Sequence, residues 1–216
     1  MRFVCAYLAL TTQRPVRLSG TGRQHERPIA PLVEALRSQG AKITYLNYEG
    51  YPPLLIEPST FAWQGCELDA SSSSQYLSAL LLLAPTLPTG FEVDTRRYGL
   101  ASRPYALMTI AQLREQGFIW EEATGGLFRY RGKVEEDSRS TSPLDRGYEA
   151  DWSAASYAYA LLSLLPVGST IKLSGLALPS LQGDAAYLGQ LFEQLGVHTK
   201  KTEAGICISH TAEEAK

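Results

Sequence analysis

Four consecutive serines and a glutamine, Ser71–Gln75, lead directly into an apolar segment that ends at Pro85. Serine is a poor residue inside a helix but a good one where a helix begins, so we predict that a helix starts within this run. Free backbone N–H groups and the positive end of the helix dipole attract anions there, and the hydroxyls of Ser73 and Ser74 would add donors for a phosphate. The residues therefore indicate a phosphate site or, as the simpler alternative, an ordinary serine cap.

Helices and strands alternate along the chain and must position these serines. The spacing of Tyr76, Ala79, Leu80, Leu81 and Leu83 predicts a mostly buried helix after the serine run. We expect a second helix that begins at Pro28, a usual first helical position, and ends at a Gly40 cap. The same patterns predict helices over 1–10 and 104–116, strands near 15–18, 42–46, 54–56, 91–94, 118–121 and 127–131, and a polar loop over 133–146.

Composition excludes several classes of protein. The 216 residues are 44% hydrophobic, which is ample for a packed core, and no apolar run approaches the ~20 residues that span a membrane. With 20 basic against 22 acidic side chains, neither nucleic acid nor an anionic membrane is an expected partner. Cys5, Cys66 and Cys207 are far apart and odd in number, as in reduced cytosolic proteins. They and the scattered histidines form no metal-ligand pattern, so we expect no metal and no cofactor.

The first ten residues, MRFVCAYLAL, form an apolar helical pattern without a capping residue. Such a start is typical of a chain that begins inside a helix, and we expect a truncation. A signal peptide is the alternative, but Leu8-Ala9-Leu10 is not a small-x-small cleavage site.

Two helices recur along the chain. The sequences that end at Gly40, Gly117 and Gly196 each close a helix before a strand, at intervals of 77 and 79 residues. The helix that follows the serine run is repeated 81 residues later, where Tyr157 and Pro166 match Tyr76 and Pro85. Because two separate helices recur at one period, we predict a structural unit of helix, strand, helix, strand and strand that is used several times.

The segments HERPIAPLVEALRSQGAKITYL, YPPL, SSQYLSALLLLAP, SRPY and LQGD resemble, in this order and along nearly the whole chain, the 5-enolpyruvylshikimate-3-phosphate synthase family. These enzymes are also called 3-phosphoshikimate 1-carboxyvinyltransferases. The resemblance implies an α/β fold, the inside-out α/β prism of the enolpyruvyl transferases. In it, repeated βαβαββ units place their helices inside and their sheets outside, in two lobes. The related transferase that acts on UDP-N-acetylglucosamine differs in the SSQ region and ranks second.

The resemblance also implies which residues bind substrates. Ser73, Ser74 and Ser102 match serines that hold the phosphate of shikimate 3-phosphate, and Gln75 matches a glutamine that reaches both substrates. Arg27, in ERPI, matches an arginine that binds phosphoenolpyruvate, for which the two parallel hydrogen bonds of a guanidinium are suited.

Two further residues have plain alternatives. Tyr105 would line the shikimate ring and Arg2 would lie near the cleft, but Tyr105 could be an aromatic residue at the rim and Arg2 a frayed terminal side chain. The aspartate and glutamate that transfer protons in the family have no match here. The resemblance therefore implies substrate-binding residues and no catalytic residue in this chain.

The resemblance places residues 1–149 in most of an N-terminal lobe and 150–216 in the first unit of a C-terminal lobe. We expect a cytoplasmic fragment of a monomeric transferase, inactive by itself, which moves the enolpyruvyl group of phosphoenolpyruvate to the 5-hydroxyl of shikimate 3-phosphate. A non-catalytic phosphate-binding or interaction fragment is the alternative. An incomplete lobe would expose leucine-rich helix faces such as Leu161–Leu165, so we expect the fragment to self-associate.

Overall fold

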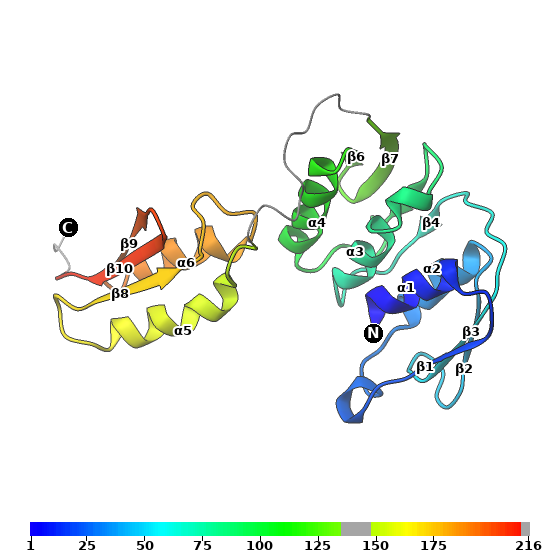
Figure 1. The fold of residues 1–216 in the computed structure, drawn as a ribbon, viewed down its shortest axis with the longest axis horizontal. Helices are drawn as coiled ribbons and strands as arrows, with labels where there is room; N and C mark the ends of the chain where they lie inside the picture. Colours follow the sequence, from blue (N-terminus) through cyan, green and yellow to red (C-terminus); the bar gives the residue numbers. More distant parts are fainter. Residues whose placement is uncertain (135–147, 213–216) are drawn as a thin grey trace. The chain divides into compact units, whose positions relative to one another are not determined.

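The computed structural model describes residues 1–134 and 148–212, which form two compact units, Met1–Asp137 and Ser138–Lys216. Each unit consists of helices packed on small sheets (Figure 1). Among the described residues, no helix is long and apolar enough to cross a membrane.

The first half of the N-terminal unit consists of two helices and a three-stranded antiparallel sheet in the order β1-β3-β2. A short 3-10 helix, Gly22–Gln24, lies between β1 and α2. The elements are α1 (Arg2–Thr11), β1 (Val16–Leu18), α2 (Ala30–Ser38), β2 (Lys42–Tyr45) and β3 (Leu54–Glu57).

The second half of this unit adds two helices and a four-stranded sheet in the order β4-β5-β7-β6, in which only β4 and β5 run parallel. A 3-10 turn, Ala84–Thr86, follows α3. The elements are β4 (Cys66–Glu67), α3 (Gln75–Leu81), β5 (Glu92–Asp94), α4 (Arg103–Glu115), β6 (Phe118–Thr124) and β7 (Leu127–Lys133).

The C-terminal unit contains the same arrangement once more, with a sheet in the order β8-β10-β9. Its helices α5 and α6 contact each other and the sheet. The elements are α5 (Trp152–Ser163), β8 (Thr170–Ser174), α6 (Asp184–Glu193), β9 (Val197–Thr202) and β10 (Gly205–His210).

The predicted repeat is confirmed by the sheets. Each sheet belongs to one repeat unit of two helices and their strands. In each sheet the last strand of the repeat unit (β3, β7 or β10) lies between the strand that follows the first helix and the strand that follows the second helix. The glycines that end the repeated helices also share one role. Gly40, Gly117 and Gly196 have φ angles of 110°, 87° and 74°, and a Cβ on any of them would lie within 2.7 Å of a backbone carbonyl oxygen. Only glycine fits such a site, which explains why the residue recurs.

Helices form the interior of the N-terminal unit. Helix α3 contacts α1, α2 and α4, and every residue of α3 except Gln75 is buried. The two sheets of this unit lie around the helical core rather than forming one central sheet, as Figure 1 shows for β1-β3-β2 and for β6 and β7. Helices inside and sheets outside are the predicted α/β arrangement.

Several predicted element bounds were wrong. The serine run is not helical, because the Asp69 carboxylate accepts hydrogen bonds from both the backbone N–H and the hydroxyl of Ser71 and so holds a turn before α3. Helix α2 begins two residues after Pro28, and Pro31 occupies its first turn instead. Strand β4 and the 3-10 helix at Gly22 were not predicted, since both are too short to show a period.

The predicted loop over 133–146 lies almost entirely outside the described residues. Lys133 itself ends β7, so the loop begins later than predicted. The chain divides into the two compact units between residues 137 and 138. The assignment of 1–149 and 150–216 to two lobes remains a prediction.

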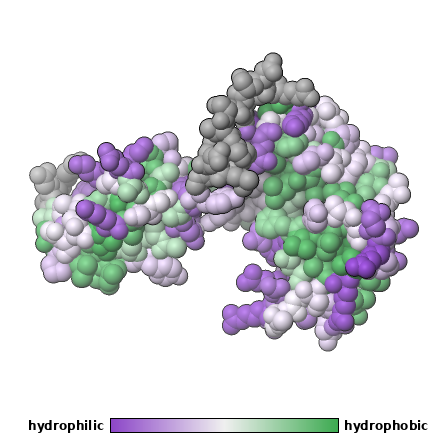
Figure 2. All heavy atoms as spheres, in the orientation of Figure 1, coloured by the Kyte–Doolittle hydropathy of each residue, from purple (hydrophilic) through white to green (hydrophobic). Residues whose placement is uncertain are grey.

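Helix α5 exposes an apolar face that its counterpart α3 buries. Tyr157 is 80% exposed whereas the matching Tyr76 is completely buried, and Leu164 is 84% exposed whereas Leu83 is 6% exposed. Hydrophobic residues gather along the edge of the C-terminal unit where α5 lies (Figure 2). The predicted exposure of leucines holds for Leu161, Leu164 and Leu165 but was wrong for Leu162, which packs into the core.

Two carboxylates hold the start of α5. Asp151 caps the helix by accepting the backbone N–H of Ser153 at 2.8 Å, and Glu149 connects the helix to neighbouring segments. Glu149 accepts hydrogen bonds from the indole N–H of Trp152 at 2.7 Å, the backbone N–H of Ala177 at 3.0 Å and the hydroxyl of Ser180 at 2.9 Å. Desolvation alone would raise the pKa of Glu149, but these hydrogen bonds outweigh it and lower the pKa below its ordinary value. The ionised carboxylate therefore stabilises the connection between α5 and the segment after β8.

Candidate functional site

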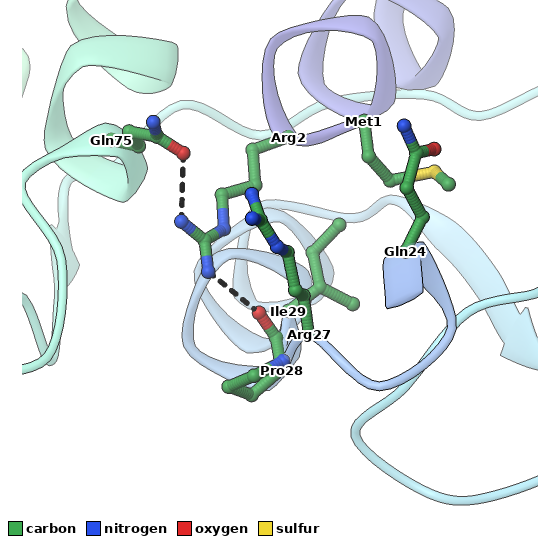
Figure 3. A pocket seen from close by; sticks show the side chains of 7 residues that line it. All are labelled: Met1, Arg2, Gln24, Arg27, Pro28, Ile29 and Gln75. Carbon is green, nitrogen blue, oxygen red and sulfur yellow. Dashed lines mark hydrogen bonds between the residues drawn. The ribbon is translucent and has the colours of Figure 1, made fainter. Parts of the chain in front are cut away.

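A small pocket of about 80 Å³ lies in the N-terminal unit where α1, the loop before α2 and the start of α3 meet (Figure 3). It is lined by Met1, Arg2, Gln24, Arg27, Pro28, Ile29 and Gln75. The lining contains two guanidinium groups and no carboxylate. A concave site with two cations and no compensating acid is suited to an anion.

Arg27 offers an available cation to this pocket. It precedes Pro28, which disfavours helical backbone at Arg27 and keeps this residue outside α2. Ile29, which follows Pro28, is buried and donates its backbone N–H to the Gly50 carbonyl at 2.9 Å, so the loop is anchored directly after Pro28. The Arg27 side chain is exposed and has no hydrogen-bond or ion-pair partner within residues 1–134 and 148–212. Its donors are therefore free for an anionic ligand.

Arg2 is instead held by the protein. Its Nη1 donates to Ser73 Oγ at 3.0 Å and to Gln75 Oε1 at 2.7 Å, and its Nη2 donates to the Pro28 carbonyl at 3.2 Å and to Tyr76 Oη at 3.3 Å. Figure 3 shows the bonds to Gln75 and Pro28, which connect α1 to the two other segments of the site. Arg2 is therefore an ordered residue, and the alternative of a frayed terminal side chain was wrong.

The segment that starts with the serine run reaches the pocket at Gln75, which lines it, while Ser73 contacts the lining residue Arg2. The hydroxyl oxygen of Ser73 accepts from Arg2 and, at 3.3 Å, from the backbone N–H of Gln75. Ser74 is the N-cap residue of α3 and is buried, but its hydroxyl makes no capping hydrogen bond. An ordinary serine cap therefore does not account for the Ser74 side chain.

Ser102 and Tyr105 lie at the start of α4. The Ala101 N–H donates to the Ala70 carbonyl at 3.0 Å, and Leu100 forms a parallel bridge with Ala70. This pairing brings the start of α4 next to the start of the serine run. Ser102 is exposed and has a left-handed backbone, with φ 48° and ψ 46°. Such a conformation costs a non-glycine residue energy and is frequent at functional sites.

The pocket brings together Arg2, Arg27 and Gln75 from three separate segments, and Ser73 contacts Arg2 at its edge. Ser74, Ser102 and Tyr105 do not line it. The sequence analysis missed Tyr76 as part of the site and treated it as core only. The tyrosine does fill the core, but its hydroxyl and its ring both contact Arg2. The sequence feature that could have indicated this role is a polar aromatic residue directly after the SSQ motif.

Within the part of the chain that the structure describes, no cluster of three His, Cys, Asp or Glu side chains could hold a metal ion. The lining of the pocket includes no histidine, cysteine or acidic residue that could donate or accept a proton near neutral pH. The arrangement can bind and orient an anion, and the groups for proton transfer are not among its lining residues.

Comparison with known proteins identifies the family of this chain. Residues 1–216 match the family model described as EPSP synthase (3-phosphoshikimate 1-carboxyvinyltransferase). The chain is 38% identical over 207 residues to a 3-phosphoshikimate 1-carboxyvinyltransferase of Bacteroides fragilis, which covers 95% of this chain and 48% of that protein. It is 35% identical over 209 residues to the protein of the same name from Sulfurovum sp., with 97% and 47% covered.

A solved structure described as EPSP synthase from Acinetobacter baumannii has the same fold, with a TM-score of 0.64 and 18% identity. The likeness covers 98% of this chain and 46% of that one. The chain thus spans about half the length of the curated relatives it matches. The match of the family model over residues 1–216 shows that this chain belongs to the EPSP synthase family.

Proposed function

We propose that this chain supplies one side of the substrate site of a 3-phosphoshikimate 1-carboxyvinyltransferase. The reaction would transfer the enolpyruvyl group of phosphoenolpyruvate to the 5-hydroxyl of shikimate 3-phosphate and release phosphate. The observation that carries this proposal is the pocket of Arg2, Arg27 and Gln75, which contains two guanidiniums and no acid. Both substrates are anions, and such a pocket is complementary to their charge.

Each residue has a proposed role in binding. Arg27, whose donors are free, would form paired hydrogen bonds to a carboxylate or phosphate of phosphoenolpyruvate. Ser73, Ser74 and Ser102 would donate hydroxyl hydrogen bonds to the phosphate of shikimate 3-phosphate, and Gln75 would reach both ligands. Tyr105, which is 43% exposed at the start of α4, would contact the shikimate ring.

The chemistry would be an addition followed by an elimination, so the chain's contribution is to bring two anions together and to stabilise charge that develops between them. Because the pocket lining holds no acid or base, proton transfer is not assigned to any residue of this chain. We propose that the chain alone binds shikimate 3-phosphate weakly and turns over no substrate. We also propose a cytosolic location, which the three free cysteines support.

The test is a titration of the 15N-labelled chain with shikimate 3-phosphate and with phosphoenolpyruvate, followed by NMR. Hydrogen bonds to charged groups contribute about 1.5 to 3 kcal/mol, so Arg27→Ala should weaken phosphoenolpyruvate binding by roughly 10- to 150-fold. The combined Ser73→Ala and Ser74→Ala variant should weaken binding of shikimate 3-phosphate. Arg23→Ala is the matched control, because Arg23 lies in the neighbouring 3-10 helix but does not line the pocket.

The outcomes separate the alternatives. Binding of shikimate 3-phosphate that the serine variants leave unchanged would refute the assignment of the serines. Preferential binding of UDP-N-acetylglucosamine would favour the sister family of transferases. Phosphate release at an ordinary enzyme rate by this chain alone would refute the half-site proposal, whereas ligand binding without any turnover is the expected result.

A further inference from the structure

The guanidinium of Arg2 has almost no donors left for a ligand. An arginine carries five N–H donors, and four of those of Arg2 are used by Ser73, Gln75, Pro28 and Tyr76, which leaves only the Nε–H. The neighbouring Arg27 has no partner in the described ranges. The two arginines that line one pocket therefore differ in what they can do, since one is available to an anion and the other is committed to the protein.

Tyr76 is the residue that fixes Arg2. The tyrosine is completely buried, and its ring lies 4.6 Å from the Arg2 guanidinium carbon as a flat cation-π platform. Its hydroxyl accepts from Arg2 Nη2 at 3.3 Å and donates to the Pro28 carbonyl at 2.7 Å. Since Arg2 Nη2 also donates to that carbonyl, the three groups form a closed triangle of hydrogen bonds beside the pocket.

We propose that Tyr76 is a positioning residue of the anion site, which acts through Arg2. The Tyr76 hydroxyl and ring hold the guanidinium in one orientation, and the guanidinium in turn fixes Ser73 and Gln75 relative to the Arg27–Pro28 loop. Tyr76 itself does not line the pocket. This inference rests on the proposed function of the pocket, and it adds a residue that the family resemblance does not assign.

The same chain contains a matched comparison. Tyr45 also lies under an arginine, with the Arg37 guanidinium carbon 4.9 Å from its ring centre, but the buried Tyr45 hydroxyl has no hydrogen-bond partner among the described residues. A tyrosine-to-phenylalanine change removes a bridging hydroxyl at Tyr76 and an unpaired one at Tyr45. Both changes leave the ring and its packing in place.

The experiment compares Tyr76→Phe with Tyr45→Phe in the full chain. The first readout is the 15N resonance of the Arg2 Nε–Hε group without ligand, and the second is the affinity for phosphoenolpyruvate and for inorganic phosphate. Tyr76→Phe should shift the Arg2 resonance and weaken anion binding by roughly three- to tenfold, the effect of about one hydrogen bond. Tyr45→Phe should change neither.

A double-variant cycle separates positioning from general stability. If Tyr76 acts through Arg2, Tyr76→Phe should have no further effect on affinity in an Arg2→Gln background. An undiminished effect in that background, or an equal effect of Tyr45→Phe, would overturn the inference. If the unchanged chain binds neither anion, the proposed function fails. The Arg2 resonance of the ligand-free variants still decides whether Tyr76 positions this arginine, and an unmoved resonance refutes it.

Discussion

Replacing Ser102 by glycine should stabilise the N-terminal unit while it weakens the site. The left-handed backbone of Ser102 costs an L-residue about 1 to 2 kcal/mol, a strain that glycine does not have. Glycine loses more backbone entropy on folding, which costs about 0.5 to 1 kcal/mol. Because the Ser102 side chain makes no capping hydrogen bond to α4, its removal loses no such bond. The free energy of unfolding should therefore rise by about 0.5 to 1 kcal/mol.

The assay is urea denaturation, combined with amide hydrogen exchange of α3 and α4 so that the N-terminal unit is measured separately. With a slope of about 2 kcal/mol per molar, Ser102→Gly should raise the midpoint by roughly 0.3 to 0.5 M. Ser102→Ala is the control, because it removes the same hydroxyl but keeps the strained backbone. Both variants should bind shikimate 3-phosphate more weakly than the unchanged chain. A glycine variant that is less stable than the alanine variant would refute the reasoning.

Three further predictions concern other parts of the chain. Because the pKa of Glu149 is lowered in the folded chain, its ionised carboxylate stabilises the fold above the ordinary glutamate pKa, and this stabilisation is lost as the pH falls through the lowered pKa. Glu149→Gln should destabilise the C-terminal unit by about 1 to 2 kcal/mol, and acid denaturation should show a weaker dependence of its stability on pH. Burial raises the pKa of Cys5 to about 12 and leaves none of this residue exposed, so iodoacetamide at pH 8 should label Cys5 only as fast as the N-terminal unit opens, and rapid labelling of Cys5 in the folded chain would contradict this. The apolar face of α5 should drive self-association, which Leu161→Gln combined with Leu164→Gln should reduce in sedimentation experiments; a monomeric unchanged chain at high concentration would count against it.

The repeated architecture was predictable because its signals are local. The residues that end each helix at Gly40, Gly117 and Gly196 have a backbone that only glycine adopts easily, so the sequence and the conformation recur together. Short elements such as β4 were not predicted, because two residues are too few to show the alternation of apolar and polar side chains that indicates a strand. We predicted that the helix starts within the serine run because serine favours helix starts. The Asp69 carboxylate instead accepts the backbone N–H of Ser71 and holds a turn, so the helix begins only at Gln75.

The candidate site was only partly predictable. Residue types and resemblance predicted Arg27 and Gln75, which line the pocket, and Ser73, which contacts Arg2, because each stands in a distinctive motif. The role of Arg2 depends on hydrogen bonds to residues 71 and 73 positions away in the sequence, for which no local pattern exists. Tyr76 was assigned to the core from its helical spacing, which is correct for its ring, but spacing carries no information about where its hydroxyl points.

The order of elements along the chain has a consequence for how the protein is made. Among the described residues, the strands of the C-terminal sheet pair only with one another, within residues 170–210, so this sheet can form from contacts that are close in sequence. The anion pocket has the opposite property, because Arg2 lies at the start of the first helix and its partners Ser73 and Gln75 are synthesised much later. During translation α1 therefore leaves the ribosome before α3, and its buried side can complete its packing only after that helix has been made.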